Sequence, residues 1–355
     1  MSEFSDFISD YDFDLPEELI AQSPAAARED ARLLLVRRYP DKGQPFFEDL
    51  EFRDLPLVLR ENDLDDACFL RNRSAVLPAR FYATRSSGSR HEFVLLEETE
   101  KKGVWKCIIR NSAKLNFPEA MKVEGCDETF KAIDADHVDL GSFSKPVDAI
   151  LAQIGEMPLP PYIKERNADR DHSRYQSVWA DKNENKSAAA PTASLHFTDD
   201  MVNVLKADGH TFADCLLHVG LGTFEPFRGD KISEHKMHSE RFFISKENQE
   251  MLRSAIDEFR PIIPIGSTAL RTLESLDLES DKVADKGGRT DLFIKPGFDC
   301  QYADALITNF HLPQSTLFVM MSVFGGSPLL AKAAYKHAVE KKYRFFSYGD
   351  ATLWI

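Results

Sequence analysis

Predicted strands and helices alternate from Gly141 to the C-terminus, and this alternation constrains the fold more than any other feature of the chain. Ile262–Ile265 is a short apolar run typical of a buried strand, and 267–276 continues as a helix. Ser327 followed by Pro328 is a helix start, because serine caps a helix and proline suits its first position. With further strands expected at 304–308 and 343–347, this pattern predicts an α/β domain.

Residues 67–140 interrupt that alternation. Short runs of strand-forming residues recur there, at 79–83, 92–96 and 104–110, with turn residues between them. We therefore expect a discontinuous α/β domain, residues 1–66 and 141–355, that carries an inserted small β-barrel domain, residues 67–140. The polar stretch 181–187 is expected to be a loop.

The charge of the chain is distributed unevenly. The 355 residues carry a net charge of −14, but residues 1–66 alone hold 18 acidic and 7 basic side chains. Two stretches are basic: 67–122, with 11 basic and 5 acidic residues, and 328–355, with 5 and 2. Since binding follows local potential more than total charge, a nucleic-acid partner remains compatible with this composition.

Several classes of protein are disfavoured. The longest nearly apolar run, 317–324, is far shorter than the ~18 residues of a membrane helix, and the N-terminus lacks the basic region of a signal peptide. We expect a cytoplasmic protein without a membrane partner. The five cysteines show no zinc or redox spacing, and no HExxH occurs, so we expect no metal. Neither GxGxxG nor a P-loop is present.

Four segments place histidine beside glycine, proline or polar residues at predicted strand or loop boundaries: 190–197, 217–224, 236–240 and 308–313. Taken singly, each histidine could be a hydrogen-bonded structural residue, and Gly220 and Gly222 could serve a tight turn. Together they favour proton-transfer chemistry, because histidine titrates near neutral pH and α/β folds place sites at the carboxyl ends of strands.

Two more segments have open interpretations. Ser267 and Thr268 begin a helix, where free N–H groups attract anions, while Arg271 and Glu274 share a helix face as a substrate contact or as a solvated ion pair. Residues 341–350 mix cations with aromatic rings. That mixture suits phosphate contact with base stacking, or equally a basic helix end before a buried strand.

Ten stretches, in order along the chain, resemble the S-adenosylmethionine:tRNA ribosyltransferase-isomerases of queuosine biosynthesis. They are DFDLPEELIAQSP (12–24), LPAR (77–80), MPLPPYI (157–163), RYQSVWA (174–180), APTASLHF (190–197), LHVGLGTFEP (217–226), MHSE (237–240), GSTALRTLES (266–275), TNFHLPQSTL (308–317) and YRFFSYGDA (343–351). The fold that the resemblance implies is a discontinuous α/β domain with a β-barrel insertion.

The resemblance also implies an activity. Such enzymes transfer the ribosyl part of S-adenosylmethionine to 7-aminomethyl-7-deazaguanine at the wobble position of a tRNA with a GUN-type anticodon. The products are epoxyqueuosine-tRNA, adenine and methionine. S-adenosylmethionine is thus a consumed donor, and no further cofactor is expected. We expect a monomer or weak oligomer.

Site residues follow from the same resemblance. Proton transfer or charge stabilisation is expected of side chains that titrate: His196, His218, His238, Glu240, His311 and Asp350. Substrate binding is expected of Arg80, Thr192, Gly222, Thr223, Ser239, Thr268, Arg271, Glu274, Asn309, Arg344 and Tyr348.

The chain departs from the family pattern at one basic position. Where the family has an Asn-Thr-Arg run before Leu77, this chain has Arg73-Ser74-Ala75, and Arg73 is a candidate substitute for the missing charge. Two alternatives therefore remain: an RNA-binding relative without turnover, and a ribosyl or alkyl transferase that acts on another nucleobase.

Overall fold

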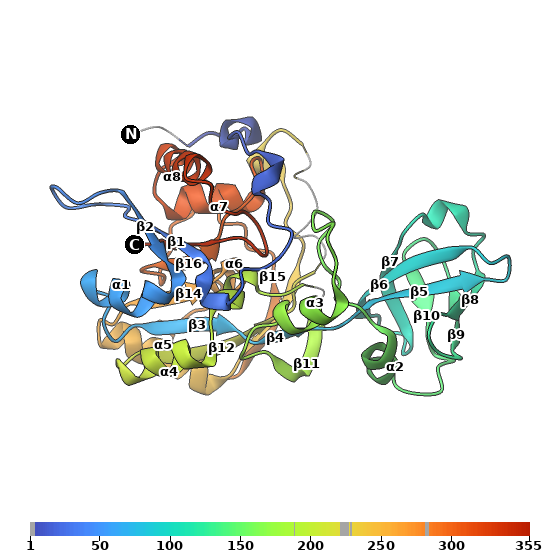
Figure 1. Ribbon diagram of the computed structural model, residues 1–355. Helices are drawn as coiled ribbons and strands as arrows, with labels where there is room; N and C mark the ends of the chain where they lie inside the picture. Colours follow the sequence, from blue (N-terminus) through green and yellow to red (C-terminus); the bar gives the residue numbers. More distant parts are fainter. Residues whose placement is uncertain (1–3, 188, 221–226, 228, 281–283) are drawn as a thin grey trace.

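The computed structural model describes residues 4–187, 189–220, 227, 229–280 and 284–355. It has two bodies, a large layered α/β body and a smaller barrel that projects from one side (Figure 1). The predicted fold class, an α/β domain with a separate β-barrel, is confirmed.

A nine-stranded mixed sheet forms the centre of the large body. Its order is β15 (Lys286–Thr290), β13 (Glu240–Ile244), β12 (Thr211–Leu217), β3 (Cys68–Asn72), β14 (Ile262–Ile265), β16 (Leu306–Asn309), β17 (Ala351–Trp354), β1 (Arg32–Val36) and β2 (Phe47–Glu51). The strands β12, β3, β14 and β16 are parallel to one another. Their carboxyl ends therefore meet at one edge of the sheet, where α/β folds form binding sites.

Helices cover both faces of this sheet because side chains alternate along each strand. Phe69 of β3 packs with α1 (Leu55–Glu61) and α4 (Asp199–Ala207), while Leu70 packs on the opposite face with α5 (Lys246–Asp257) and α6 (Ser267–Leu273). Helices α7 (Thr316–Phe324) and α8 (Pro328–Glu340) pack on β1 and β16. Ser327 caps α8, as predicted, by accepting from the N–H groups of Leu329 and Leu330.

Shorter elements connect these layers. They are α2 (Val147–Ile154), α3 (Ala168–Arg174) and the 3₁₀ helices η1 (Ile8–Tyr11), η2 (Glu17–Leu19), η3 (Arg28–Asp30), η4 (Phe52–Asp54), η5 (Ser112–Lys114), η6 (Thr192–His196) and η8 (Ile232–Glu234).

The barrel closes with every neighbouring pair of strands antiparallel. Its order is β10 (His137–Asp139), β7 (Val104–Ile109), β6 (Arg90–Glu98), β5 (Arg80–Arg85), β8 (Glu119–Val123) and β9 (Thr129–Ala132). Phe81, Phe93 and Phe130 fill its interior. The first strand of the barrel thus begins at Arg80, whereas β3, at the start of the expected insertion, belongs to the large sheet. The domain boundaries expected at residues 67 and 140 stay a proposal.

Two sequence-based expectations are wrong. Residues 343–347 do not form a strand; the strand is β17, because the chain turns at Phe346, which has a left-handed backbone (φ 73°). Residues 181–187 form the strand β11 (Asp181–Ser187), which pairs in parallel with β4 (Ser74–Val76) through an irregular register. The sequence of this polar segment has no pattern typical of a strand. The strand forms because its backbone pairs with that of β4.

In the part of the chain that the structure describes, no single helix has the length and apolar character to cross a membrane. Taken together, α7 and α8 meet that test by length and composition only, with a bend of 113° between them.

Candidate functional site

A cavity of about 650 Å³ lies at the carboxyl edge of the parallel strands. Val219 follows β12, Gly266–Thr268 follow β14, and Thr308–His311 span the end of β16 and the two residues after it; all of these residues line the cavity. Thr192, at the start of η6, completes this wall. The structure therefore brings together Thr192, Thr268, Asn309 and His311 from three segments that lie far apart in the sequence.

Gly266 allows β14 to turn into α6 beside the cavity. Its φ of 88° is in the region that residues with a Cβ rarely adopt, and an added Cβ would lie 3.3 Å from the Cβ of Ala193. A larger residue here would push η6 and α6 apart. The close approach keeps Thr192 and Thr268 on the same cavity.

Asn72, which is not among the predicted site residues, ties the strand ends together. Its side-chain amide donates to the carbonyl of Leu217 (2.9 Å) and to Thr268 Oγ1 (3.3 Å), and its Oδ1 accepts from the N–H groups of Leu217 and Ser74 (both 3.0 Å). The side chain is fully buried. A polar residue at the end of an apolar strand was the available signal, because buried amides need partners.

His311 is the one histidine among the described residues that line the cavity. The Tyr335 hydroxyl lies 3.2 Å from the His311 backbone nitrogen, which donates to it, and 3.1 Å from Nδ1. This arrangement favours a proton on Nε2, which lies 3.4 Å from Thr308 Oγ1. Burial lowers the pKa of His311 to about 3, so the ring is neutral.

His196 lies behind the cavity wall, where its ring packs against Phe52. Burial lowers the pKa of His196 to about 3, while hydrogen bonding to Asn309 acts in the opposite direction. It also lines a second, small pocket with Arg344 and Tyr348. Its position supports an orienting contact with Asn309.

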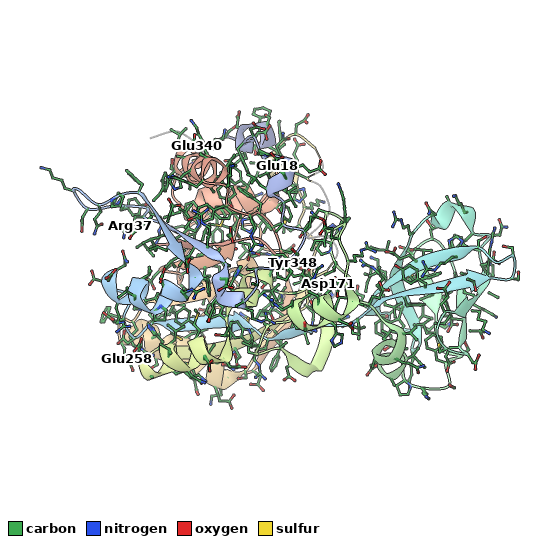
Figure 2. All side chains as sticks on the ribbon, viewed as in Figure 1. Glu18, Arg37, Asp171, Glu258, Glu340 and Tyr348 are labelled. Carbon is green, nitrogen blue, oxygen red and sulfur yellow. The ribbon has the colours of Figure 1, made fainter. Side chains whose placement is uncertain are left out.

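Arg344, Tyr348 and Asp350 are held in the last turn before β17. Tyr348 donates to Asp171 Oδ1 (3.0 Å), and the two residues are labelled next to each other in Figure 2. Asp350 is buried and accepts from the backbone N–H groups of Arg344 (2.8 Å) and Arg32 (3.1 Å). The carboxylate of Asp350 thus ties the start of this turn, at Arg344, to the first residue of β1.

Glu240 and Arg271 form a buried ion pair. The other oxygen of Glu240 accepts from the N–H of Gly220 (3.0 Å), and Arg271 Nε donates to the carbonyl of Leu292 (2.9 Å). Arg271 therefore does not pair with Glu274. Glu274 instead accepts from three backbone N–H groups at 301–303, and burial raises its pKa.

The remaining predicted residues lie elsewhere. Arg80 is buried at the root of the barrel, with an ion pair to Glu92 (3.3 Å). Ser239 is exposed, and its Oγ accepts from Arg289 (3.0 Å). His218 follows β12, its N–H bonded to the carbonyl of Arg241, and His238 is exposed. Gly222 and Thr223 lie outside the described residues.

The N-terminal arm, residues 4–12, forms a wall of the cavity that the sequence did not predict. Phe7, Ile8 and Ser9 line the cavity. Asp6 fastens the arm by accepting from Ser233, both from its backbone N–H (2.7 Å) and from its hydroxyl (2.6 Å). These hydrogen bonds lower the pKa of Asp6. No local periodicity marks such a contact, because the arm and its anchor are more than 220 positions apart.

Asp230 is the one side chain with a formal charge at neutral pH among the described residues that line the cavity. The cavity wall therefore favours a cationic ligand over an anionic one. A separate group with possible metal-ligand spacing, Asp134, Asp136 and His137, lies at the start of β10 in the barrel, and none of its three residues lines the cavity.

Comparison with known proteins gives consistent similarities. The family model described as "Queuosine biosynthesis protein" matches residues 8–354. An S-adenosylmethionine:tRNA ribosyltransferase-isomerase of Thermotoga petrophila is 38% identical over 350 residues, which are 98% of this chain and 99% of that protein. The enzyme of the same name from Thermosipho africanus is 40% identical over 345 residues, 97% and 98% of the two chains.

A solved structure is also similar. It is the crystal structure of S-adenosylmethionine tRNA ribosyltransferase from Thermotoga maritima, at a TM-score of 0.54 and 30% sequence identity. The match covers 98% of this chain and 100% of that one.

Proposed function

Because this chain belongs to the family of S-adenosylmethionine:tRNA ribosyltransferase-isomerases of queuosine biosynthesis, we propose that it transfers and isomerises the ribosyl moiety of S-adenosylmethionine onto a tRNA base. The acceptor is the aminomethyl group of 7-aminomethyl-7-deazaguanine at the wobble position. The products are epoxyqueuosine-tRNA, adenine and methionine.

One observation carries this proposal: three family-like segments, 190–197, 266–275 and 308–317, meet on one cavity at the carboxyl edge of the sheet. Its volume of about 650 Å³ falls within the ~300–1,000 Å³ common for small-molecule sites. The charge of Asp230 suits the sulfonium and ammonium groups of S-adenosylmethionine.

The chemistry needs several proton movements. The attacking amine loses a proton, the ribose C–H that the sulfonium acidifies loses another, and the departing adenine gains one. His311 is placed to orient a substrate by donating from Nε2 in exchange for its 3.4 Å contact with Thr308 Oγ1, since Tyr335 occupies Nδ1. The hydroxyls of Thr192 and Thr268 and the amide of Asn309 would hydrogen-bond the ribose or base edges.

Glu240 and Arg271 would act by holding neighbouring backbone in position, without touching the substrate. Glu240 holds the N–H of Gly220, the residue before the segment that contains Gly222 and Thr223. We assign these two residues to substrate binding, with Glu240 and Arg271 fixing where their segment leaves β12.

The tRNA would lie across the basic stretches 67–122 and 328–355. We propose a tRNA with a GUN-type anticodon, a cytoplasmic location, and a monomer or weak oligomer as the working state.

The test is incubation of the protein with S-adenosylmethionine and tRNA that carries the deazaguanine precursor. Release of adenine together with a mass gain of the tRNA is expected. Folded protein that gives neither result would contradict the proposal. The same assay with tRNA lacking the precursor base is the control.

An RNA-binding relative without turnover is the second candidate, and one observation favours it. Arg73, the candidate for the missing family arginine, is committed to ion pairs with Asp214 (3.3 Å) and Asp181 (3.4 Å). Binding of tRNA without consumption of S-adenosylmethionine would select this candidate. Turnover with an unmodified RNA or a free base would instead select a transferase for another nucleobase.

A further inference from the structure

Phe346 is held in an unfavourable backbone conformation beside the cavity. Its φ of 73° is left-handed, which is rare for a residue with a bulky side chain and persists only where the surroundings enforce it. Two donors converge on its carbonyl oxygen, the Asn309 side-chain amide (2.9 Å) and the N–H of Gly349 (2.8 Å), while its own N–H donates to the carbonyl of Phe310 (3.2 Å). The peptide groups of Phe346 are thus fixed on both sides.

The fixed backbone presents an aromatic ring to the cavity. Phe346 and Tyr162 both line it, with ring centroids 4.2 Å apart and planes at 62° to each other. Tyr162 is anchored by its hydroxyl, 2.5 Å from Ser347 Oγ. Its ring meets that of Phe346 at a steep angle, in the T-shaped arrangement that aromatic pairs favour. Phe346 is also only partly buried, although the residues on both sides of it are buried.

We propose that Phe346 is the stacking platform for a purine-type ring in this cavity, with Tyr162 as its support and Asn309 as the residue that positions it. This inference rests on the proposed function, whose reaction brings two such rings together: the adenine of S-adenosylmethionine and the 7-deazaguanine of the tRNA. Stacking on an aromatic face is the contact that both rings share. The left-handed backbone then has a role, because an extended residue at this position would not turn the chain so that Asn309 and Gly349 can both donate to the carbonyl of Phe346.

The experiment compares Phe346→Leu, Phe346→Tyr and Phe346→Ala with the wild-type protein. Leucine keeps apolar bulk and loses the aromatic face, and tyrosine keeps the face. Phe259→Ala is the matched control, because Phe259 also has a left-handed backbone (φ 57°) but is 95% exposed, at the end of α5. Thermal melting of each variant establishes that it is folded.

Two measurements distinguish which of the two rings stacks on Phe346. The first is the equilibrium affinity for S-adenosylhomocysteine, which has the adenine but cannot donate a ribosyl group in this reaction; the second is KM for the modified tRNA. Loss of stacking is expected to weaken one of them by about 5- to 150-fold in the leucine and alanine variants, and by less than about twofold in the tyrosine variant. A change in the first identifies adenine as the stacked ring, and a change in the second identifies the deazaguanine.

Unchanged affinity and unchanged KM in folded Phe346→Leu would overturn the platform. A wild-type protein that binds the adenosyl ligand but releases no adenine would count against the proposed function alone, since the affinity readout does not need turnover. Asn309→Ala, made alone and with Phe346→Leu, tests positioning. Its effect on affinity should be smaller in the double variant than in the wild-type background, whereas fully additive effects would overturn the positioning role.

Discussion

Arg271 of α6 reaches across to Glu240 of β13, and the two form an ion pair in which both side chains are less than a tenth exposed. The pair also fixes the backbone at two other places. Glu240 accepts from the N–H of Gly220, and Arg271 donates to the carbonyl of Leu292. A buried charge that loses its partner remains in a medium that solvates it poorly.

Glu240→Gln or Arg271→Met should therefore each lower the free energy of unfolding by about 3–5 kcal/mol. The double variant should lose less than the sum of the two, since it leaves no unpaired charge. Urea unfolding of the four proteins measures this coupling. Glu250→Gln, which breaks the exposed pair with Lys246, is the control and should change stability by less than about 0.5 kcal/mol. Additive losses at 240 and 271 would contradict the prediction.

Acid should destabilise the protein through its buried histidines, two of which, His196 and His311, have a strongly lowered pKa. The pKa of His196 and of His311 is about 3 in the folded protein, against 6.5 for the ordinary side chain. Between these values the unfolded chain binds the proton and the folded chain does not, so stability is complete above pH 6.5 and falls as the pH is lowered toward 3. Each of these two histidines changes the free energy of unfolding by up to about 1.4 kcal/mol per pH unit.

His311→Asn should flatten the slope of stability against pH, because it removes one of the histidines whose pKa is lowered by burial. Unfolding free energies at several pH values between 4 and 7 measure it. The same substitution at exposed His172 is the control and should leave the slope as it is. A slope in His311→Asn equal to that of the wild type would show that His311 takes up a proton in the folded protein.

The N-terminal arm should contribute to ligand affinity although it lies at the end of the chain. Asp6→Ala removes both hydrogen bonds to Ser233, so residues 4–12 should exchange their amide hydrogens faster and affinity for S-adenosylmethionine should fall several-fold. Hydrogen exchange and calorimetry measure the two effects. Phe4→Ala is the control, since Phe4 is on the arm but is not among the cavity residues. Faster hydrogen exchange with unchanged affinity would show that the arm does not contribute to ligand binding.

Charge reversal at Lys341 and Lys342 should weaken tRNA binding and flatten its salt dependence, because fewer counterions are released when fewer phosphates are neutralised. Each lost phosphate contact should reduce the slope of log K against log salt by about 1. Filter binding at several salt concentrations measures it. Reversal at Lys206 and Lys246, exposed residues outside the basic stretches, is the matched control. A slope unchanged from the wild type would place the tRNA elsewhere.

Much of the architecture could be predicted because its signals are local. The apolar run 262–265 and the helix after it are visible in neighbouring residues, and they became β14 and α6. The barrel followed from short strands separated by turns. The strand expected at 343–347 failed because Asn309, 37 positions away, and Gly349 hold Phe346 in a turn. The sequence of residues 343–347 does not indicate that contact.

The sequence by itself determined the family, the two-body fold and the inventory of side chains available for chemistry, since these depend on motifs and on short-range periodicity. Only the tertiary structure decided which side chains meet. Helical spacing offered Glu274 as the partner of Arg271, but the order of strands in the sheet supplied Glu240. That order follows from burying apolar faces over the whole chain, so the acidic N-terminal arm could become a cavity wall without any local sign of it.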